Sequence, residues 1–125
     1  MERTTPEGVI RGFAERLNER DVDGALELYE PDASFVVEPG TTVTGHDQIR
    51  AALERFAALR PQLTGEIAGV RRGGDVALVL NRWSLHGEGP EGPVAMSGTS
   101  ADVLRRRPDG SWGVLIDDPW GGEAG

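Results

Sequence analysis

The 125-residue sequence contains no cysteine and no lysine. Without cysteine the chain can form no disulfide, no thiolate nucleophile and no cysteine-bound metal centre. Without lysine it has neither a Schiff-base amine nor the lysine of a phosphate-binding loop. The groups left for proton transfer are the two histidines, the one tyrosine and the carboxylates.

Long apolar runs and excess positive charge are also absent. No segment has membrane-spanning length, and no charged-then-apolar leader begins the sequence, so we expect a cytoplasmic protein with no membrane partner. The 13 arginines stand against 21 acidic residues, for a formal net charge of -8. This charge repels phosphate backbones, so nucleic acid is not an expected partner. The length suits one domain over residues 1–125.

The spacing of apolar residues predicts three helices and five strands. Helical spacing covers residues 5–18, 21–30 and 46–60. β-Branched and aromatic runs between turn-forming residues predict strands at 33–38, 63–71, 75–86, 93–107 and 111–118. This order indicates an α+β fold, in which three helices pack on the concave side of a curved antiparallel sheet. Such a cone-shaped hollow suits a small apolar ligand.

Two stretches of the sequence carry a family resemblance: "LNERDVDGALELYEPDASF" at 17–35 and "TSADVLRRRPDGSWGVLIDDPWG" at 99–121. With the order of elements, they resemble the nuclear transport factor 2-like superfamily, which includes ketosteroid isomerases and SnoaL-like polyketide cyclases. The resemblance implies the cone fold, a homodimer formed through the sheet, and neither a redox cofactor nor a metal. It does not fix the activity, because the fold hosts enzymes, binders and assembly modules.

Similarity to ketosteroid isomerase implies two catalytic carboxyls. The general base of that enzyme precedes a proline, which matches Glu38 before Pro39 with a small register slip. Its neutral aspartic acid, which donates a hydrogen bond, matches Asp102. Its oxyanion tyrosine corresponds to Phe13, so that donor is missing here.

Strand alternation supports a pocket position for Asp102. It places Asp102 on one face with Met96 and Ser100, towards the expected hollow, where desolvation would raise the carboxyl pKa. The alternatives are that the faces of the strand are inverted, or that Asp102 forms a structural ion pair with one of three arginines: Arg82, Arg105 or Arg106. The arginine run at 105–107 also offers internal counter-charge to the carboxylates of this acidic chain.

Two more carboxylates stand where strands end. Glu38 lies beside a rigid turn, which suits a base, although a solvated turn glutamate is the alternative. At the end of the last strand, alternation places Asp118 at the rim of the hollow, with Trp120 folded over it as a lid. The same alternation places Asp117 on the convex side. The alternative is that both aspartates are solvated.

The remaining candidates are aromatic residues, apolar residues and histidines. Along the strand at 75–86, either Trp83 or His86 can face the hollow. A convex Trp83 would suit a dimer interface, and an inward His86 would titrate near neutrality. His46 suits helix capping, and two histidines so far apart form no metal-site pattern. The expected apolar wall comprises Phe13, Leu17, Tyr29, Phe56 and Met96.

The leading interpretation is a cofactor-independent isomerase or cyclase that moves a proton on an apolar, polyketide-like or steroid-like carbonyl metabolite. In it Glu38 is the base, Asp102 the neutral donor and Asp118 a residue that orients the substrate. The rival interpretation is a non-catalytic ligand-binding or dimeric scaffold module of the same fold.

Overall fold

The computed structural model describes residues 2–123, in which helices come first and most strands follow. A short 3-10 helix (Glu2–Thr4) precedes α1 (Pro6–Asn18) and α2 (Val22–Glu27). Next come β1 (Tyr29–Glu38), β2 (Thr41–Thr44) and α3 (His46–Ala57). Four strands complete the fold: β3 (Gln62–Gly73), β4 (Val76–Gly89), β5 (Gly92–Arg106) and β6 (Trp112–Asp118). The α+β class is confirmed.

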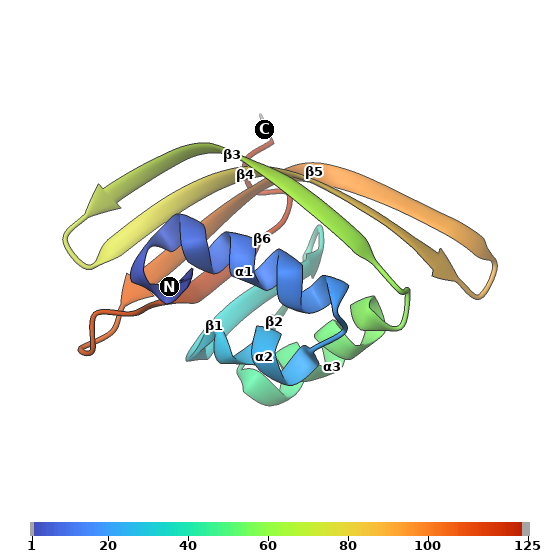
Figure 1. The fold of residues 1–125 in the computed structure, drawn as a ribbon, viewed down its shortest axis with the longest axis horizontal. Helices are drawn as coiled ribbons and strands as arrows, with labels where there is room; N and C mark the ends of the chain where they lie inside the picture. The colour runs from blue at the N-terminus through green and yellow to red at the C-terminus, as the bar shows by residue number, and fades with distance from the viewer. Residues whose placement is uncertain (1, 124–125) are drawn as a thin grey trace.

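All six strands form one curved sheet in the order β2-β1-β6-β5-β4-β3. Figure 1 shows β3, β4 and β5 arching over α1, with α2 and α3 lying near β1 and β2. The sheet is mixed, because β1 and β6 run parallel while every other neighbouring pair is antiparallel. The expectation of a purely antiparallel sheet was therefore wrong for this pair. Parallel neighbours need a long crossover, and here α3 and four strands separate β1 from β6.

The helices begin where the sequence places their caps. Thr5 accepts a hydrogen bond from the backbone N of Gly8 at 3.0 Å, and Pro6 occupies the first turn of α1. Asp21 accepts from the backbone N of Gly24 at 2.9 Å and starts α2. These short-range signals made the starts of α1 and α2 predictable.

The predicted second helix at 21–30 ends too late. α2 stops at Glu27, and Tyr29 begins β1 instead of lying on a helical face. The carbonyl of Leu28 accepts a hydrogen bond from the backbone N of Val114 at 2.8 Å. Pairing with β6 thus replaces the helical hydrogen bonds that local periodicity had suggested.

The prediction also lacked a strand. Residues 41–44 form β2, which pairs with β1 across the turn at Gly40, whose φ is 87°. Positive φ suits glycine, so the turn itself was readable from the sequence, whereas four mostly polar residues gave no strand signal. The ends of the last four strands lie within three residues of those predicted.

The core lies between the helices and the concave face of the sheet. Its largest fully buried side chains include Trp112, Tyr29, Ile49 and Leu53. At one end of the sheet, buried Glu30 accepts hydrogen bonds from Arg105 Nε at 3.0 Å and from Arg107 Nε at 2.5 Å. The arginine run therefore does supply counter-charge within the fold.

Candidate functional site

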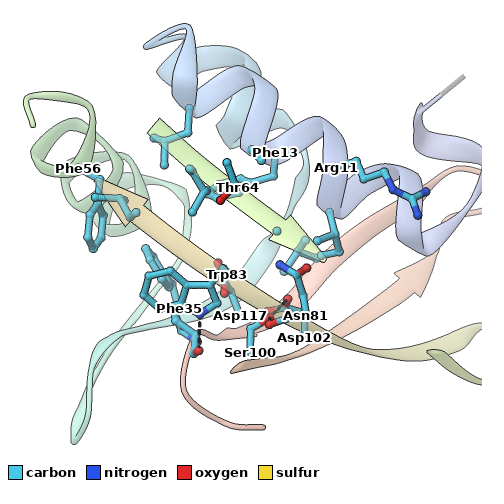
Figure 2. A pocket seen from close by; sticks show the side chains of 18 of the residues that line it. Arg11, Phe13, Phe35, Phe56, Thr64, Asn81, Trp83, Ser100, Asp102 and Asp117 are labelled. Atoms are coloured by element: carbon cyan, nitrogen blue, oxygen red, sulfur yellow. Dashed lines mark hydrogen bonds between the residues drawn. The ribbon is translucent and has the colours of Figure 1, made fainter. Parts of the chain in front are cut away.

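A cavity of about 280 Å³ lies between α1, α3 and the concave face of the sheet. Most of its lining is apolar. It includes the expected lid residue Trp120 and all five expected wall residues: Phe13, Leu17, Tyr29, Phe56 and Met96. Tyr29 reaches the wall from β1, and its ring stacks edge-on against Phe13 with 5.9 Å between centroids. Figure 2 shows Phe13, Phe35, Phe56 and Trp83 around the cavity. Asn81, Ser100, Asp102 and Asp117 lie together at one part of the wall, whereas Arg11 and Thr64 lie elsewhere on it.

Asp102 is the most deeply buried carboxyl in the cavity wall, with 4% of its surface exposed. Its Oδ2 accepts a hydrogen bond from Ser100 Oγ at 2.9 Å. Burial raises the pKa of Asp102 well above its ordinary value, and the nearby charge of Asp117 raises it further. Asp102 therefore favours its neutral, proton-donating form.

The arginines considered as partners of Asp102 bind other carboxylates. Arg82 pairs with Glu66 at 3.1 Å, and Arg106 pairs with Asp75 at 2.6 Å. Arg105 binds Glu30. The ion-pair alternative for Asp102 is therefore not found.

A β-bulge decides which aspartate of β6 faces the cavity. Leu104 pairs with Val114 and Val103 with Ile116, so Leu115 has no partner on β5. This extra residue inverts the alternation of side chains beyond it. Asp117 lines the cavity, while Ile116 is 41% exposed on the convex face.

The expectations for the two adjacent aspartates were consequently reversed. Asp118 does not line the cavity, and its Oδ1 accepts a hydrogen bond from the backbone N of Trp120 at 3.2 Å. It shapes the turn after β6 and is not positioned to orient a ligand. Of these two aspartates, Asp117, which was expected on the convex side, is the one that lines the cavity.

Asp117 and Asp102 occupy directly opposed positions on β6 and β5. Tyr29 donates a hydrogen bond from its hydroxyl to Asp117 Oδ2 at 2.5 Å. Burial raises the pKa of Asp117, whereas hydrogen bonds from Asp102 and Tyr29 oppose that rise. Burial, followed by the charge of Asp117, raises the pKa of Tyr29 well above its ordinary value, so the hydroxyl keeps its proton.

The two opposed carboxyls can therefore share one proton. With both ionised, the fully buried Asp102 Oδ1 would have no hydrogen-bond partner among residues 2–123. A hydrogen bond between the carboxyls requires that one be protonated, and it raises the pKa of Asp102 while lowering that of Asp117. The pair thus divides into an acid, Asp102, and a base, Asp117.

Glu38, the base expected from the resemblance, lies away from the cavity. It is exposed at the β1–β2 turn, where Thr41 Oγ1 donates a hydrogen bond to its Oε1 at 3.3 Å. The hairpin pairs Glu38 with Thr41 after a register shift, which directs the strand end outward. Glu38 and Asp102 are therefore not brought together.

Trp83, not His86, faces the hollow. Trp83 lines the cavity, and its Nε1 donates a hydrogen bond to the Pro119 carbonyl at 2.7 Å. Its ring stacks edge-on against Trp120 with 5.8 Å between centroids. The suggested convex position of Trp83 was wrong, and His86 is exposed at the end of β4.

Residues 119–123 form a C-terminal strap across β5. The backbone N of Gly122 donates to the Thr99 carbonyl at 3.0 Å, and Glu123 Oε1 accepts from the Thr99 N at 3.1 Å. A Cβ atom on Gly98 would lie 2.9 Å from Trp120 Cδ1, so only glycine allows this approach. The strap holds Trp120 in the cavity wall.

His46 has a structural contact instead of a place in the cavity wall, since its Nε2 lies 3.0 Å from the Tyr29 carbonyl oxygen. Over residues 2–123, no group of three or more histidine, aspartate or glutamate side chains could hold a metal ion. In the same range, every helix is too short or too polar to span a membrane.

The sequence contains one signal for the site that lies outside the residues predicted above. Asn81 is a polar residue within the apolar run "VALVLNRWSL", and it lines the cavity together with Ser100. The Asp117–Asp118 pair marked the correct strand end but not the correct residue. Only the pairing of β6 with β5 reveals the bulge that turns Asp117 into the cavity and Asp118 away from it.

Comparison with known proteins supports this description of the fold. The model of the SnoaL-like domain matches residues 10–113, whereas no curated protein matches the chain. A conserved protein from Planctomyces limnophilus superposes with a TM-score of 0.80 and 16% identity, covering 89% of this chain and 88% of that one. A proposed dehydratase of the nuclear transport factor 2-like family from Streptomyces avermitilis superposes with a TM-score of 0.76 and 18% identity, covering 88% of this chain and 89% of that one.

A nuclear transport factor 2-like protein of unknown function from Shewanella oneidensis gives a TM-score of 0.73 and 19% identity, covering 87% of this chain and 90% of that one. Sequence identities this low indicate a shared fold but not a shared activity. The family model, by contrast, spans most of the chain and confirms the resemblance found in the sequence. The chain belongs to the SnoaL-like family of the nuclear transport factor 2-like superfamily.

Proposed function

We propose that the protein is a cofactor-independent enzyme that moves a proton on an apolar carbonyl metabolite, as an isomerase or a cyclase does. The observation that carries this proposal is the Asp102–Asp117 pair, with Tyr29 bound to Asp117, in a mostly apolar cavity. An acid and a base side by side in a desolvated site are what enolisation of a carbonyl compound requires.

In the proposed reaction, the carbonyl oxygen of the substrate lies against neutral Asp102. The Asp117 carboxylate removes a proton from the carbon next to the carbonyl, and the C–H electron pair forms the enolate double bond. As Asp117 takes up this proton, Asp102 turns its own hydrogen bond from Asp117 to the enolate oxygen. Return of the proton to another carbon gives an isomer, whereas attack of the enolate carbon on a second carbonyl, with protonation of the new alkoxide, closes a ring.

The surrounding side chains support this chemistry. Tyr29 fixes Asp117 through a 2.5 Å hydrogen bond, which limits the rotamer freedom of the base. Aromatic residues such as Phe35 and Trp83 line the cavity and suit a flat ring system. The volume of about 280 Å³ lies near the lower end of the range for small-molecule sites, which favours a compact substrate.

The test is exchange of the α-protons of 2-tetralone in D₂O, followed by NMR. We expect the wild-type protein to accelerate exchange and Asp117→Asn to lower the rate by roughly 100-fold or more, the usual contribution of a general base. Asp118→Asn is the matched control, because the adjacent carboxylate lies outside the cavity lining. No acceleration above buffer, or equal losses in both variants, would refute the proposal.

A non-catalytic ligand-binding module is the second candidate. It is favoured by the engagement of Tyr29 with Asp117, which leaves no tyrosine hydroxyl free to bind the substrate oxygen. The same assay separates the two candidates, because a binder would shift the NMR signals of the protein without exchanging the ligand protons.

We further propose that two copies pair through the convex face of the sheet. Val76 and Ile116 are the exposed large hydrophobic residues of residues 2–123, at 47% and 41% exposure. Strand register places them on one face with half-buried Leu78, Leu80 and Val103. A continuous apolar patch of this kind is typical of an interaction surface.

A further inference from the structure

Asn81 is a polar cavity residue that the proton-transfer scheme leaves unused. It lies on the concave face of β4, half-buried, between the inward-facing positions of Val79 and Trp83. Among residues 2–123, its side-chain amide has no hydrogen-bond partner, since the 3.4 Å contact with Ser100 Oγ is made by the backbone carbonyl. An amide offers two donors and an acceptor, so leaving it unpaired in an apolar wall costs free energy.

The amide stands close to the carboxyl pair. Asn81 pairs directly with Ser100, and Asp102 is the next residue of β5 on that face. Such diagonal neighbours lie about 7 Å apart at their Cβ atoms, within reach of one small molecule. Figure 2 shows Asn81, Ser100, Asp102 and Asp117 together in the same part of the cavity wall.

Gly65 on the neighbouring strand β3 keeps the space for this amide. A Cβ atom on Gly65 would lie 2.8 Å from Asn81 Oδ1 and 3.0 Å from Nδ2. Both distances are shorter than ordinary van der Waals contact, so any side chain at this position would displace the amide. The absence of a side chain at residue 65 therefore leaves Asn81 free to contact a ligand.

We propose that Asn81 binds a second oxygen of the ligand and selects substrates that carry two oxygen functions in a 1,3-relationship, such as a β-hydroxycarbonyl or a 1,3-dicarbonyl compound. The inference rests on the proposed function, since Asp102 is taken to hold the first, carbonyl oxygen. Asn81 is then a specificity-determining residue, because an apolar ketone without the second oxygen leaves its amide unpaired.

The test compares the affinity of 1-indanone with that of 3-hydroxy-1-indanone, which differs by one hydroxyl on the carbon β to the carbonyl carbon. Binding is followed by NMR titration of the protein. We expect the wild-type protein to bind the hydroxyketone roughly 10-fold more tightly, which is the effect of about one hydrogen bond. Asn81→Leu should abolish this preference while retaining the affinity for 1-indanone, which also reports that the cavity is intact.

Gly65→Ala provides a second variant that leaves the amide present but displaced. It should reduce the preference for the hydroxyketone. Gly69→Ala on the same strand is its control, since a Cβ there would meet no atom closer than 3.4 Å. A preference that survives both Asn81→Leu and Gly65→Ala, equal wild-type affinities, or binding of neither ketone would overturn the inference.

The outcomes also separate this inference from the enzymatic proposal. Selective binding of the hydroxyketone without α-proton exchange in 2-tetralone would support the role of Asn81 and refute the enzymatic proposal. Proton exchange without selective binding would support the enzymatic proposal and refute the role of Asn81.

Discussion

Replacing Tyr29 with phenylalanine would test how the base is held. The ring is buried, with 1% of its surface exposed, and its packing against Phe13 and Phe35 remains in the variant. The only group lost is the hydroxyl that donates to Asp117 Oδ2 at 2.5 Å. The perturbation is therefore confined to one hydrogen bond.

The expected loss of stability follows from the charge of the acceptor. A hydrogen bond to an ionised group contributes about 1.5–3 kcal/mol to the free energy of unfolding. Asp117 is half-buried and lines the cavity, where water can replace the lost donor. We therefore expect the lower part of this range, about 1.5–2 kcal/mol at neutral pH.

The variant should also shift the acidic limb of the pH–activity profile. The hydrogen bond from Tyr29 lowers the pKa of Asp117, so its removal raises that pKa and requires a higher pH to ionise the base. Urea denaturation of Tyr29→Phe, Asp117→Ala and the double variant gives the coupling energy, and the pH profile of 2-tetralone exchange gives the shift. Additive losses of stability together with an unchanged profile would refute the reasoning.

Three further predictions concern Asp102, Glu30 and Ile116. Burial raises the pKa of Asp102 above its unfolded value of about 3.9, so the native state holds a proton that the unfolded chain releases. The free energy of unfolding should therefore fall as the pH rises from about 4 through the raised pKa. Urea denaturation across this pH range should show a flatter dependence in Asp102→Asn, and identical slopes would contradict this. Glu30→Gln should lose about 2 kcal/mol by weakening the bonds from Arg105 and Arg107, with unchanged ketone affinity by NMR titration; a loss of affinity would contradict the separation of this network from the cavity. Ile116→Glu should yield monomers in sedimentation analysis, and a persistent dimer would place the interface elsewhere.

Local sequence signals predicted the elements whose structure local interactions determine. The cap residues Thr5 and Asp21 marked the starts of two helices, and long alternating runs marked the last four strands. The errors occurred where a distant segment intervenes. The end of α2 and the parallel partner of β1 both depend on β6, which lies more than eighty residues further along the chain.

The same distinction separates the correct and incorrect site residues. Asp102 lies on a strand without a register break between residues 92 and 103, so counting by two from Met96 gave its face correctly. Asp118 was misassigned because the bulge at Leu115 changes the count, and no residue type announces that bulge in the sequence. Trp83 required knowledge of its partner strands, since alternation alone allowed either face of β4.

The contact between Tyr29 and Asp117 joins the first and last strands of the fold, 88 residues apart in sequence. Closing so large a loop costs conformational entropy before local contacts can compensate for it, so this contact forms late in folding. The cavity wall is therefore complete only after β6 has docked beside β1. A ligand of this cavity would bind the finished fold and not its intermediates, so it should slow unfolding while leaving the folding rate unchanged.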